Sequence, residues 1–250
     1  MKTRKSHLAA VAASLLLCAF YASVRAASEP ATEYVYKNTT DRPLKIYLTY
    51  PENWSQSDSR AVLVYFHNGG WKPETVNRQF EEQTRYFAAR GMVAARADYR
   101  EKDKSGVTSQ KCIEDIFSAV RWLRKNAETL GIDRDRIAAG GGSGSGHLAA
   151  SVFYVDELGA PDDDPSICPQ LGALMLFNPD LDVLEPRIMQ RMLGGSTRTR
   201  NMPPMLVFYG TRDVSHKLIV DFVARARNLG MPVEAFVGED ATHGFFKFSP

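Results

Sequence analysis

A run of glycine and serine at positions 140–146, Gly-Gly-Gly-Ser-Gly-Ser-Gly, constrains this chain more than any other feature. Apolar residues flank the run on both sides, which is typical of a strand, a tight turn and a buried helix. A nucleophile elbow has this form, because small neighbours let the backbones approach each other around a strained turn. The pattern predicts that Ser143 lies at the turn, with its hydroxyl at the positive end of the following helix.

The match to the elbow pattern G-x-S-x-G is incomplete, because Ser145 stands where the last glycine is expected. Serine is small, so we expect mild strain there rather than loss of the turn. Successive helical residues are rotated by about 100°, so the side chain of Ser145 should point away from that of Ser143. Two alternatives are a flexible loop, which the apolar flanks disfavour, and a weak dinucleotide-binding fingerprint, Gly144-x-Gly146-x-x-Ala149.

The composition suits one globular domain with a sizeable core, preceded by a different kind of segment. The chain has 250 residues, a net charge of +2 and 44% hydrophobic residues, which gives no reason to expect nucleic-acid binding.

Near the start, three basic residues precede an apolar run at 8–24, and small residues follow at 24–26. We expect residues 1–26 to be a secretory signal peptide and residues 27–250 to be exported to the periplasm or the medium. A membrane anchor is the alternative, which the many Ala and Ser residues disfavour.

The cysteines indicate neither a zinc site nor any other cofactor site. Cys18 lies in the expected signal peptide, so Cys112 and Cys168 remain in a chain bound for an oxidising compartment. A disulfide between them is allowed, but the sequence does not determine whether they are close. Neither has a second Cys or a His at the spacing of metal ligands, so we expect no metal.

Short strand-like segments alternate with longer helix-like segments along the chain. This alternation predicts an α/β fold, with a mostly parallel sheet of about eight strands and helices on both faces. We expect strands at 32–37, 44–50, 61–66, 92–97, 136–140, 174–177, 205–209 and 233–237, and helices at 76–90, 111–130 and 216–229.

Two residues that could complete a catalytic site lie just after expected strands. A serine nucleophile needs a general base within hydrogen-bond reach, and the base needs an orienting carboxylate. Asp213 follows the strand at 205–209, and His243 follows the strand at 233–237. In an open parallel sheet such groups gather at the carboxyl ends of the strands. The order Ser143, Asp213, His243 is the one expected of an α/β-hydrolase.

Other titratable residues are weaker candidates. His147 lies in the first turn after the elbow and is expected to be structural, and His216 opens a helix and is expected at the surface. Asp180 and Asp182, which follow the strand at 174–177, remain alternative orienting acids.

The loop after the strand at 61–66 is the expected oxyanion hole. It has the sequence His67-Asn68-Gly69-Gly70-Trp71. Two consecutive glycines can turn their N–H groups inward with no side chain in the way. The backbone N–H groups of Gly69, Gly70 and Gly144 are therefore expected to bind a developing negative charge.

The chain resembles the esterase/lipase branch of the α/β-hydrolase superfamily, with hormone-sensitive-lipase-like and acetylxylan-esterase-like members. The resemblance runs from residue 49 to residue 248 and implies Ser143 as nucleophile, Asp213 as orienting acid and His243 as base. It also implies a mainly structural role for Asp98 and Arg100. The motifs that carry it lie at 67–71, 90–93, 97–100, 119–123, 131–137, 141–149, 210–213 and 243–246.

The chain departs from the family pattern at three places. Asn68 replaces the first glycine of the H-G-G-G motif, which is usually not a donor, so the oxyanion hole should survive. Ser145 replaces the last elbow glycine, and Ser145→Gly is expected to keep or raise activity. The chain ends at Pro250, where the family normally adds a helix, so Phe245, Phe246 and Phe248 are expected to have little cover.

These features predict an exported serine carboxylesterase that acts on short-chain acyl esters through an acyl-enzyme. The stretch at 178–204 is too short for a separate cap domain, so we expect an open site that suits a small acyl group on a bulky alcohol, such as an acetylated sugar. Two alternatives remain: a non-catalytic binding protein on a hydrolase scaffold, and a peptidase of the same fold. The sequence does not determine the acyl group, the alcohol or the oligomeric state.

Overall fold

The computed structural model describes residues 31–68, 78–101, 107–151, 159–181 and 203–246. The expected signal peptide, Gly69, Gly70 and Phe248 lie outside these ranges. Asp182 also lies outside them, as does most of the stretch at 178–204, which was considered too short for a cap domain.

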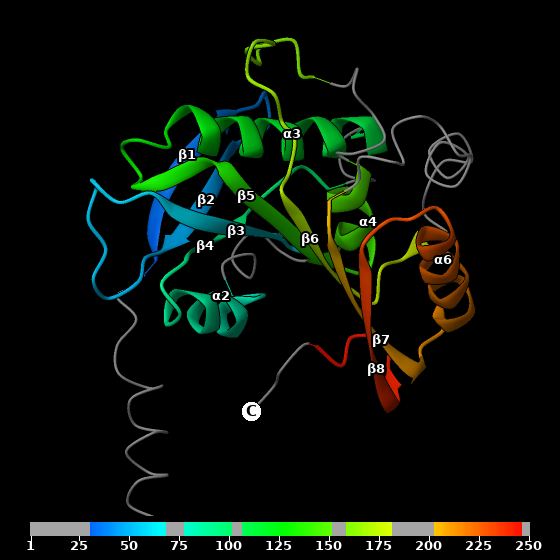
Figure 1. Cartoon of the computed structure of the whole chain (residues 1–250). Coiled ribbons are helices and arrows are strands. Elements are labelled where there is room, and N and C mark those ends of the chain that lie inside the picture. Colours follow the sequence, from blue (N-terminus) through cyan, green and yellow to red (C-terminus); the bar gives the residue numbers. More distant parts are fainter. Residues whose placement is uncertain (1–30, 69–77, 102–106, 152–158, 182–202, 247–250) are drawn as a thin grey trace, which may run out of the picture.

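Eight strands form one sheet in the order β1-β2-β4-β3-β5-β6-β7-β8 (Figure 1). The pairs β1–β2 and β2–β4 are antiparallel, and every other neighbouring pair is parallel. The predicted α/β-hydrolase sheet is thereby confirmed. The strands are β1 (Thr32–Asn38), β2 (Pro43–Thr49), β3 (Arg60–Phe66), β4 (Val93–Ala97), β5 (Ile132–Gly142), β6 (Ala173–Phe177), β7 (Met205–Arg212) and β8 (Val233–Thr242).

The strand order reverses beside β3, and this reversal fixes where a ligand can bind. From β3 the chain passes to β4 on one side, and then crosses to β5 on the other side. In open α/β sheets, ligands bind outside the carboxyl ends of the strands at such a reversal. The elbow follows β5 and the expected oxyanion loop follows β3, so both begin at this reversal.

Helices cover both faces of the sheet (Figure 1). The helices α3, α4 and α6 pack on one face, and α2 packs on the other. The described helices are α2 (Glu81–Ala88), α3 (Ser109–Lys125), α4 (Gly144–Ser151) and α6 (His216–Asn228).

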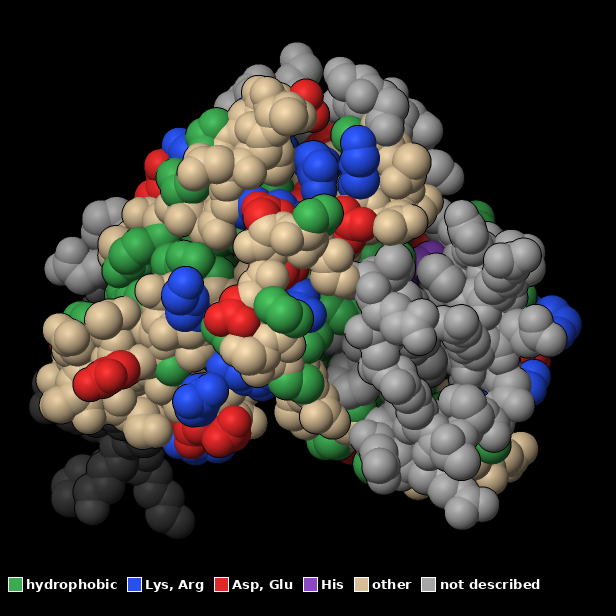
Figure 2. Space-filling view, turned by 90° about the horizontal axis from the view of Figure 1, so that it is seen from above, with side chains coloured by type: hydrophobic (Ala, Val, Ile, Leu, Met, Phe, Trp, Pro, Cys, Tyr) green, Lys and Arg blue, Asp and Glu red, His purple; other side chains and the backbone are tan. Residues whose placement is uncertain are grey.

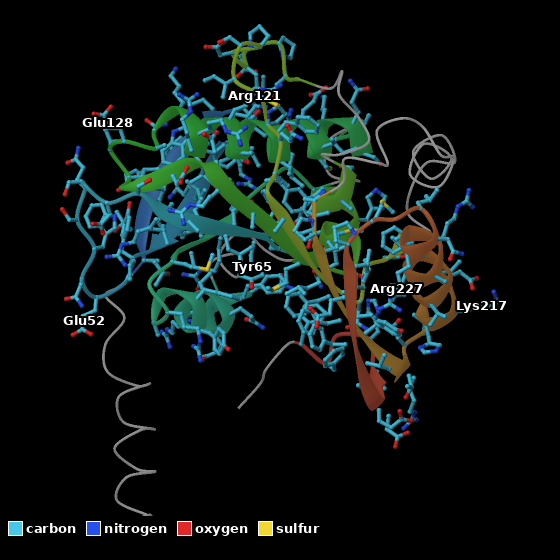
Figure 3. The ribbon with its side chains drawn as sticks, viewed as in Figure 1. Glu52, Tyr65, Arg121, Glu128, Lys217 and Arg227 are labelled. Atoms are coloured by element: carbon cyan, nitrogen blue, oxygen red, sulfur yellow. The ribbon has the colours of Figure 1, made fainter. Side chains whose placement is uncertain are left out.

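Alternate side chains of β3 enter two separate cores. Val62, Val64 and Phe66 join the large apolar core under α3 and α4. Leu63 and Tyr65 face the other way, and Figure 3 shows Tyr65 on the α2 side of the sheet. Both sets are almost fully buried, because successive side chains of a strand point to opposite faces and both faces are covered.

Two predicted helices are shorter than the sequence indicated. Within the described residues, the helix expected at 76–90 begins only at Glu81, because Phe80 before it is left-handed, with φ 62°. The helix expected at 111–130 begins at Ser109, where the Thr108 side chain caps it, and ends at Lys125. Gly131, the expected stop, has φ 60° and the Trp54 ring lies against it, so a side chain there would clash.

The expectation that the C-terminal aromatic residues have little cover is wrong for Phe246. Phe246 is 3% exposed and belongs to the smaller core with Tyr65 and Phe177. Its ring stacks on Phe80 at a centroid distance of 5.6 Å and an interplanar angle of 7°. Phe245, by contrast, is 37% exposed.

Neither Cys112, which is buried in α3, nor Cys168, which is exposed, forms a disulfide in the described part of the chain. No helix in the described ranges is long and apolar enough to cross a membrane. Figure 2 shows basic and acidic side chains interspersed on one face of the molecule, in keeping with the small net charge.

Candidate active site

Ser143 stands at the turn between β5 and α4 in a left-handed backbone conformation, with φ 54°. This conformation costs an ordinary L-residue about 1–2 kcal/mol, so the surrounding structure must hold it. The Ser143 N–H donates to the carbonyls of Phe177 (2.9 Å) and Asn178 (3.1 Å). The Ser143 carbonyl accepts from the Asp180 N–H at 3.0 Å. The segment after β6 therefore holds the turn from both sides.

The glycines before Ser143 are required by close packing. A Cβ atom at Gly142 would overlap the Phe246 ring, and a Cβ atom at Gly141 would lie 2.7 Å from the backbone of Ser145. Gly144 differs, because a Cβ atom there would meet no atom of the described residues within 4 Å. The elbow is thus closely packed at Gly141 and Gly142.

The Ser145 hydroxyl forms buried hydrogen bonds that the sequence did not indicate. The Ser145 side chain is fully buried, and its Oγ accepts from the Gly142 N–H at 3.0 Å. The same hydroxyl lies 2.8 Å from the Phe66 carbonyl and 3.2 Å from Asn68 Oδ1, both of which can accept its proton. The expectation of mild strain missed these contacts, which join the elbow to the end of β3.

His243 lies between Ser143 and Asp213 and contacts both. His243 Nε2 is 3.0 Å from Ser143 Oγ, and His243 Nδ1 is 3.1 Å from each carboxylate oxygen of Asp213. The carboxylate can only accept, so Nδ1 carries a proton and the neutral ring leaves Nε2 free to accept from the Ser143 hydroxyl. The His243 side chain is 31% exposed, so solvent reaches the imidazole.

The Asp213 carboxylate is fully buried and, among the described residues, accepts hydrogen bonds from three groups. Besides His243, its Oδ1 accepts from the Ser215 N–H at 2.7 Å, and its Oδ2 accepts from the Asn178 side-chain amide. The structure brings Asp213 to His243, whereas the Asp180 backbone contacts Ser143 and His147.

The start of the expected oxyanion loop is anchored by neighbouring polar groups. The Asn68 N–H donates to Gln79 Oε1 at 2.8 Å, so it is not available to an oxyanion. The His67 ring stacks on Tyr99 at 4.3 Å, and the Tyr99 hydroxyl donates to the His67 carbonyl at 2.8 Å. Gly144 begins α4, whereas the position of the Gly69 and Gly70 N–H groups is outside the described ranges.

Asp98 and Arg100, assigned a structural role by resemblance, each form buried ion pairs. Asp98 contacts Arg42 and His67, and Arg100 contacts Asp115 at 2.7 Å. Burial alone would raise the pKa of Asp98, but hydrogen bonds from His67 and Arg42 outweigh burial and hold that pKa below its ordinary value.

The remaining histidines lie apart from the contact between Ser143 and His243. His147 is buried in α4 with its Nδ1 3.3 Å from the Asp180 carbonyl, and burial lowers its pKa to about 4. His216 is half-buried rather than exposed, with its Nδ1 3.1 Å from the Gly210 carbonyl. Within the described residues no group of His, Cys, Asp and Glu side chains is arranged to hold a metal ion.

The sequence did not single out Asn178, although this residue contacts both Ser143 and Asp213. Its backbone carbonyl accepts from Ser143, and its side-chain amide donates to Asp213. The only signal in the sequence was its position directly after the strand ending at Phe177. An amide at a strand end is too common to single out without the sheet order.

The comparisons with known proteins agree with this geometry. A family model described as BD-FAE matches residues 44–161. The structure of Thermogutta terrifontis esterase 2 phosphorylated by paraoxon is 36% identical with a TM-score of 0.77, and the match covers 89% of this chain and 87% of that one. The same esterase with butyrate bound is 35% identical with a TM-score of 0.73, and the match covers 89% and 87% of the two chains.

A curated relative matches over a shorter region. The carboxylesterase NlhH of Mycobacterium tuberculosis is 29% identical over 129 residues, which is 50% of this chain and 38% of that protein. The chain therefore matches well under half of the length of that relative.

Proposed function

Because the chain belongs to the esterase/lipase branch of the α/β-hydrolase superfamily, we propose that it is an exported serine carboxylesterase that hydrolyses short-chain acyl esters. The observation that carries the proposal is the contact of His243 with both Ser143 Oγ and the buried Asp213 carboxylate. This arrangement can activate a hydroxyl as a nucleophile at neutral pH.

In the first half of the reaction, His243 Nε2 takes the Ser143 proton as Oγ attacks the ester carbonyl carbon. The carbonyl oxygen becomes an oxyanion, which the N–H groups of Gly144, Gly69 and Gly70 stabilise. Asp213 stabilises the imidazolium through Nδ1. The C–O bond to the alcohol then breaks, and the alcohol leaves with the proton from Nε2, so that the acyl group remains on Ser143.

In the second half, a water molecule gives a proton to His243 Nε2 and attacks the acyl carbon. The same N–H groups stabilise the second oxyanion, and the bond to Ser143 Oγ breaks as Oγ takes the proton back. The exposure of His243 supports this step, because water must reach the imidazole.

The esterase 2 structures with propionate and with butyrate bound support a short acyl group. An acetylated carbohydrate fits the proposal as one kind of bulky alcohol. The basic start and the apolar run at 8–24 support export. If the protein is exported, mass spectrometry of the protein recovered from the envelope or medium should find a mature start near Ala27.

The proposal is tested by turnover of p-nitrophenyl esters of rising acyl length, followed by acetylated oligosaccharides. We expect the highest kcat/KM with acetate to butyrate, and no turnover or fluorophosphonate labelling of Ser143→Ala. A folded wild-type protein that is neither active nor labelled would indicate a non-catalytic binding protein. Preferential cleavage of peptides would indicate a peptidase.

A further inference from the structure

Asn178 touches the candidate site at two points that lie far apart in the sequence. Its backbone carbonyl accepts from the Ser143 N–H at 3.1 Å, and its side-chain Nδ2 donates to Asp213 Oδ2. Its own N–H donates to the Phe208 carbonyl at 2.7 Å, which extends the pairing between β6 and β7 by one residue. One residue at the end of β6 therefore links the elbow after β5 to the carboxylate after β7.

The backbone of Asn178 is held in a conformation that few residues adopt. Its φ is 44°, in the left-handed region where asparagine is among the tolerated residues. This conformation turns the carbonyl towards Ser143 while the side chain points to Asp213. Together with the left-handed Ser143, it places two strained residues in direct hydrogen-bond contact. Such strain gathers at functional sites.

The orientation of the Asn178 amide is set by the carboxylate it faces. Asn178 is fully buried, and its Oδ1 has no hydrogen-bond partner in the described part of the chain. Reversing the amide would bring Oδ1 against the Asp213 oxygen, with no proton between two acceptors. An unpaired buried oxygen destabilises the folded state, so packing alone would favour an apolar side chain here.

We propose that Asn178 is a positioning residue, which fixes the Asp213 carboxylate relative to Ser143 so that His243 can bridge them. The inference rests on the proposed esterase function. Asn178 donates to Oδ2, the Ser215 N–H donates to Oδ1, and His243 Nδ1 contacts both oxygens, so that the two outer donors together restrain the rotation of the carboxylate. The other nearby histidines, His147 and His216, contact backbone carbonyls of Asp180 and Gly210.

Two substitutions at Asn178 distinguish the contribution of the side-chain amide to activity from that of the left-handed backbone. Asn178→Gly accepts the positive φ and removes the amide. Asn178→Asp keeps the shape and replaces the donor with a second carboxyl beside Asp213. For Asn178→Gly we expect kcat for p-nitrophenyl acetate to fall by about tenfold or more, with KM changed less than about twofold, because positioning acts on the chemical step.

For Asn178→Asp we expect the acidic limb of the kcat/KM profile to move up by about one pH unit. Two buried carboxyls in contact retain one proton between them, and full ionisation of both favours the protonated imidazole, so the three side chains release their last proton only at higher pH. The matched control is Asn126→Gly. The Asn126 side-chain amide also donates a hydrogen bond, to the Trp122 carbonyl at 2.8 Å, but Asn126 is the C-cap of α3 and does not follow a strand. Asn126→Gly should keep the wild-type kcat and pH profile.

A kcat for Asn178→Gly within about twofold of the wild type would overturn the inference, as would an unmoved acidic limb for Asn178→Asp. If Asn178→Gly fails to fold by circular dichroism, the Asn178→Asp profile decides alone. A wild-type protein without esterase activity or fluorophosphonate labelling would refute the proposed function itself. An active wild type with unaffected Asn178 variants would refute this inference alone.

Discussion

The hydroxyl of Ser145 and the carbonyl of Phe66 lie 2.8 Å apart, and this contact joins the elbow to the last residue of β3. The hydroxyl also accepts from the Gly142 N–H and lies beside Asn68. The chain departs from the family pattern at both Ser145 and Asn68, and the side chains of these two residues contact each other. A glycine at position 145 would leave the Gly142 N–H without this partner.

Ser145→Gly and Ser145→Ala should therefore lower the free energy of unfolding by about 1–3 kcal/mol, because each leaves buried polar groups unpaired. The expectation that Ser145→Gly keeps or raises activity is a separate prediction, which concerns turnover rather than stability. Urea denaturation measures the effect. The control is Ser166→Ala, which removes an exposed hydroxyl that donates to Asp164 and should stay within about 0.5 kcal/mol. Equal stability of Ser145→Gly and wild type would contradict the role of the buried hydroxyl.

Asp213→Asn should lower kcat for p-nitrophenyl acetate by roughly 10³–10⁴-fold, because an amide beside Nδ1 favours the wrong tautomer of His243. Asp240→Asn is the matched control, since Asp240 is exposed, precedes His243 by three residues, and has a positive φ that asparagine tolerates. The control should stay within about twofold of the wild type. The assignment of the acid is wrong if Asp213→Asn keeps its activity while Asp182→Asn loses it.

Phe246→Ala should lower the free energy of unfolding by about 3–5 kcal/mol, because the ring is buried and fills the space against Gly142 and Phe80. Phe245→Ala, its exposed neighbour, should cost much less. Thermal or urea unfolding of the two variants gives the comparison. Similar costs for the two substitutions would mean that Phe246 is not packed as described.

Stability should fall as the pH is lowered from about 6.5 to about 4, in part because of His147. Burial lowers the pKa of His147 to about 4, whereas the unfolded chain has a value near 6.5. Between these values the unfolded state binds more protons, so acid favours unfolding by up to about 3 kcal/mol. His147→Asn cannot titrate, so its unfolding free energy should depend less steeply on pH over this range. The same slope in variant and wild type would argue against this cause.

The sequence by itself determined the sheet, the elbow and the order of the polar residues after the strands. Alternating apolar segments specify strands and helices locally, and the glycines around Ser143 specify a turn that few other residues allow. Asp213 and His243 could be predicted because parallel strands end at one edge of the sheet, which brings the residues after β7 and β8 to the same side.

Only the tertiary structure decided which side chains meet across the strand ends. The contact of Asn178 with Asp213 depends on the pairing of β6 with β7, and that of Ser145 with Phe66 depends on the register of β5 against β3. Phe246 is buried because α2 and β6 leave a space over Gly142 that its ring fills. A one-residue change in register would shift the end of one strand along its neighbour and separate Asn178 from Asp213 and Ser145 from Phe66. Register is a property of paired strands rather than of any single segment.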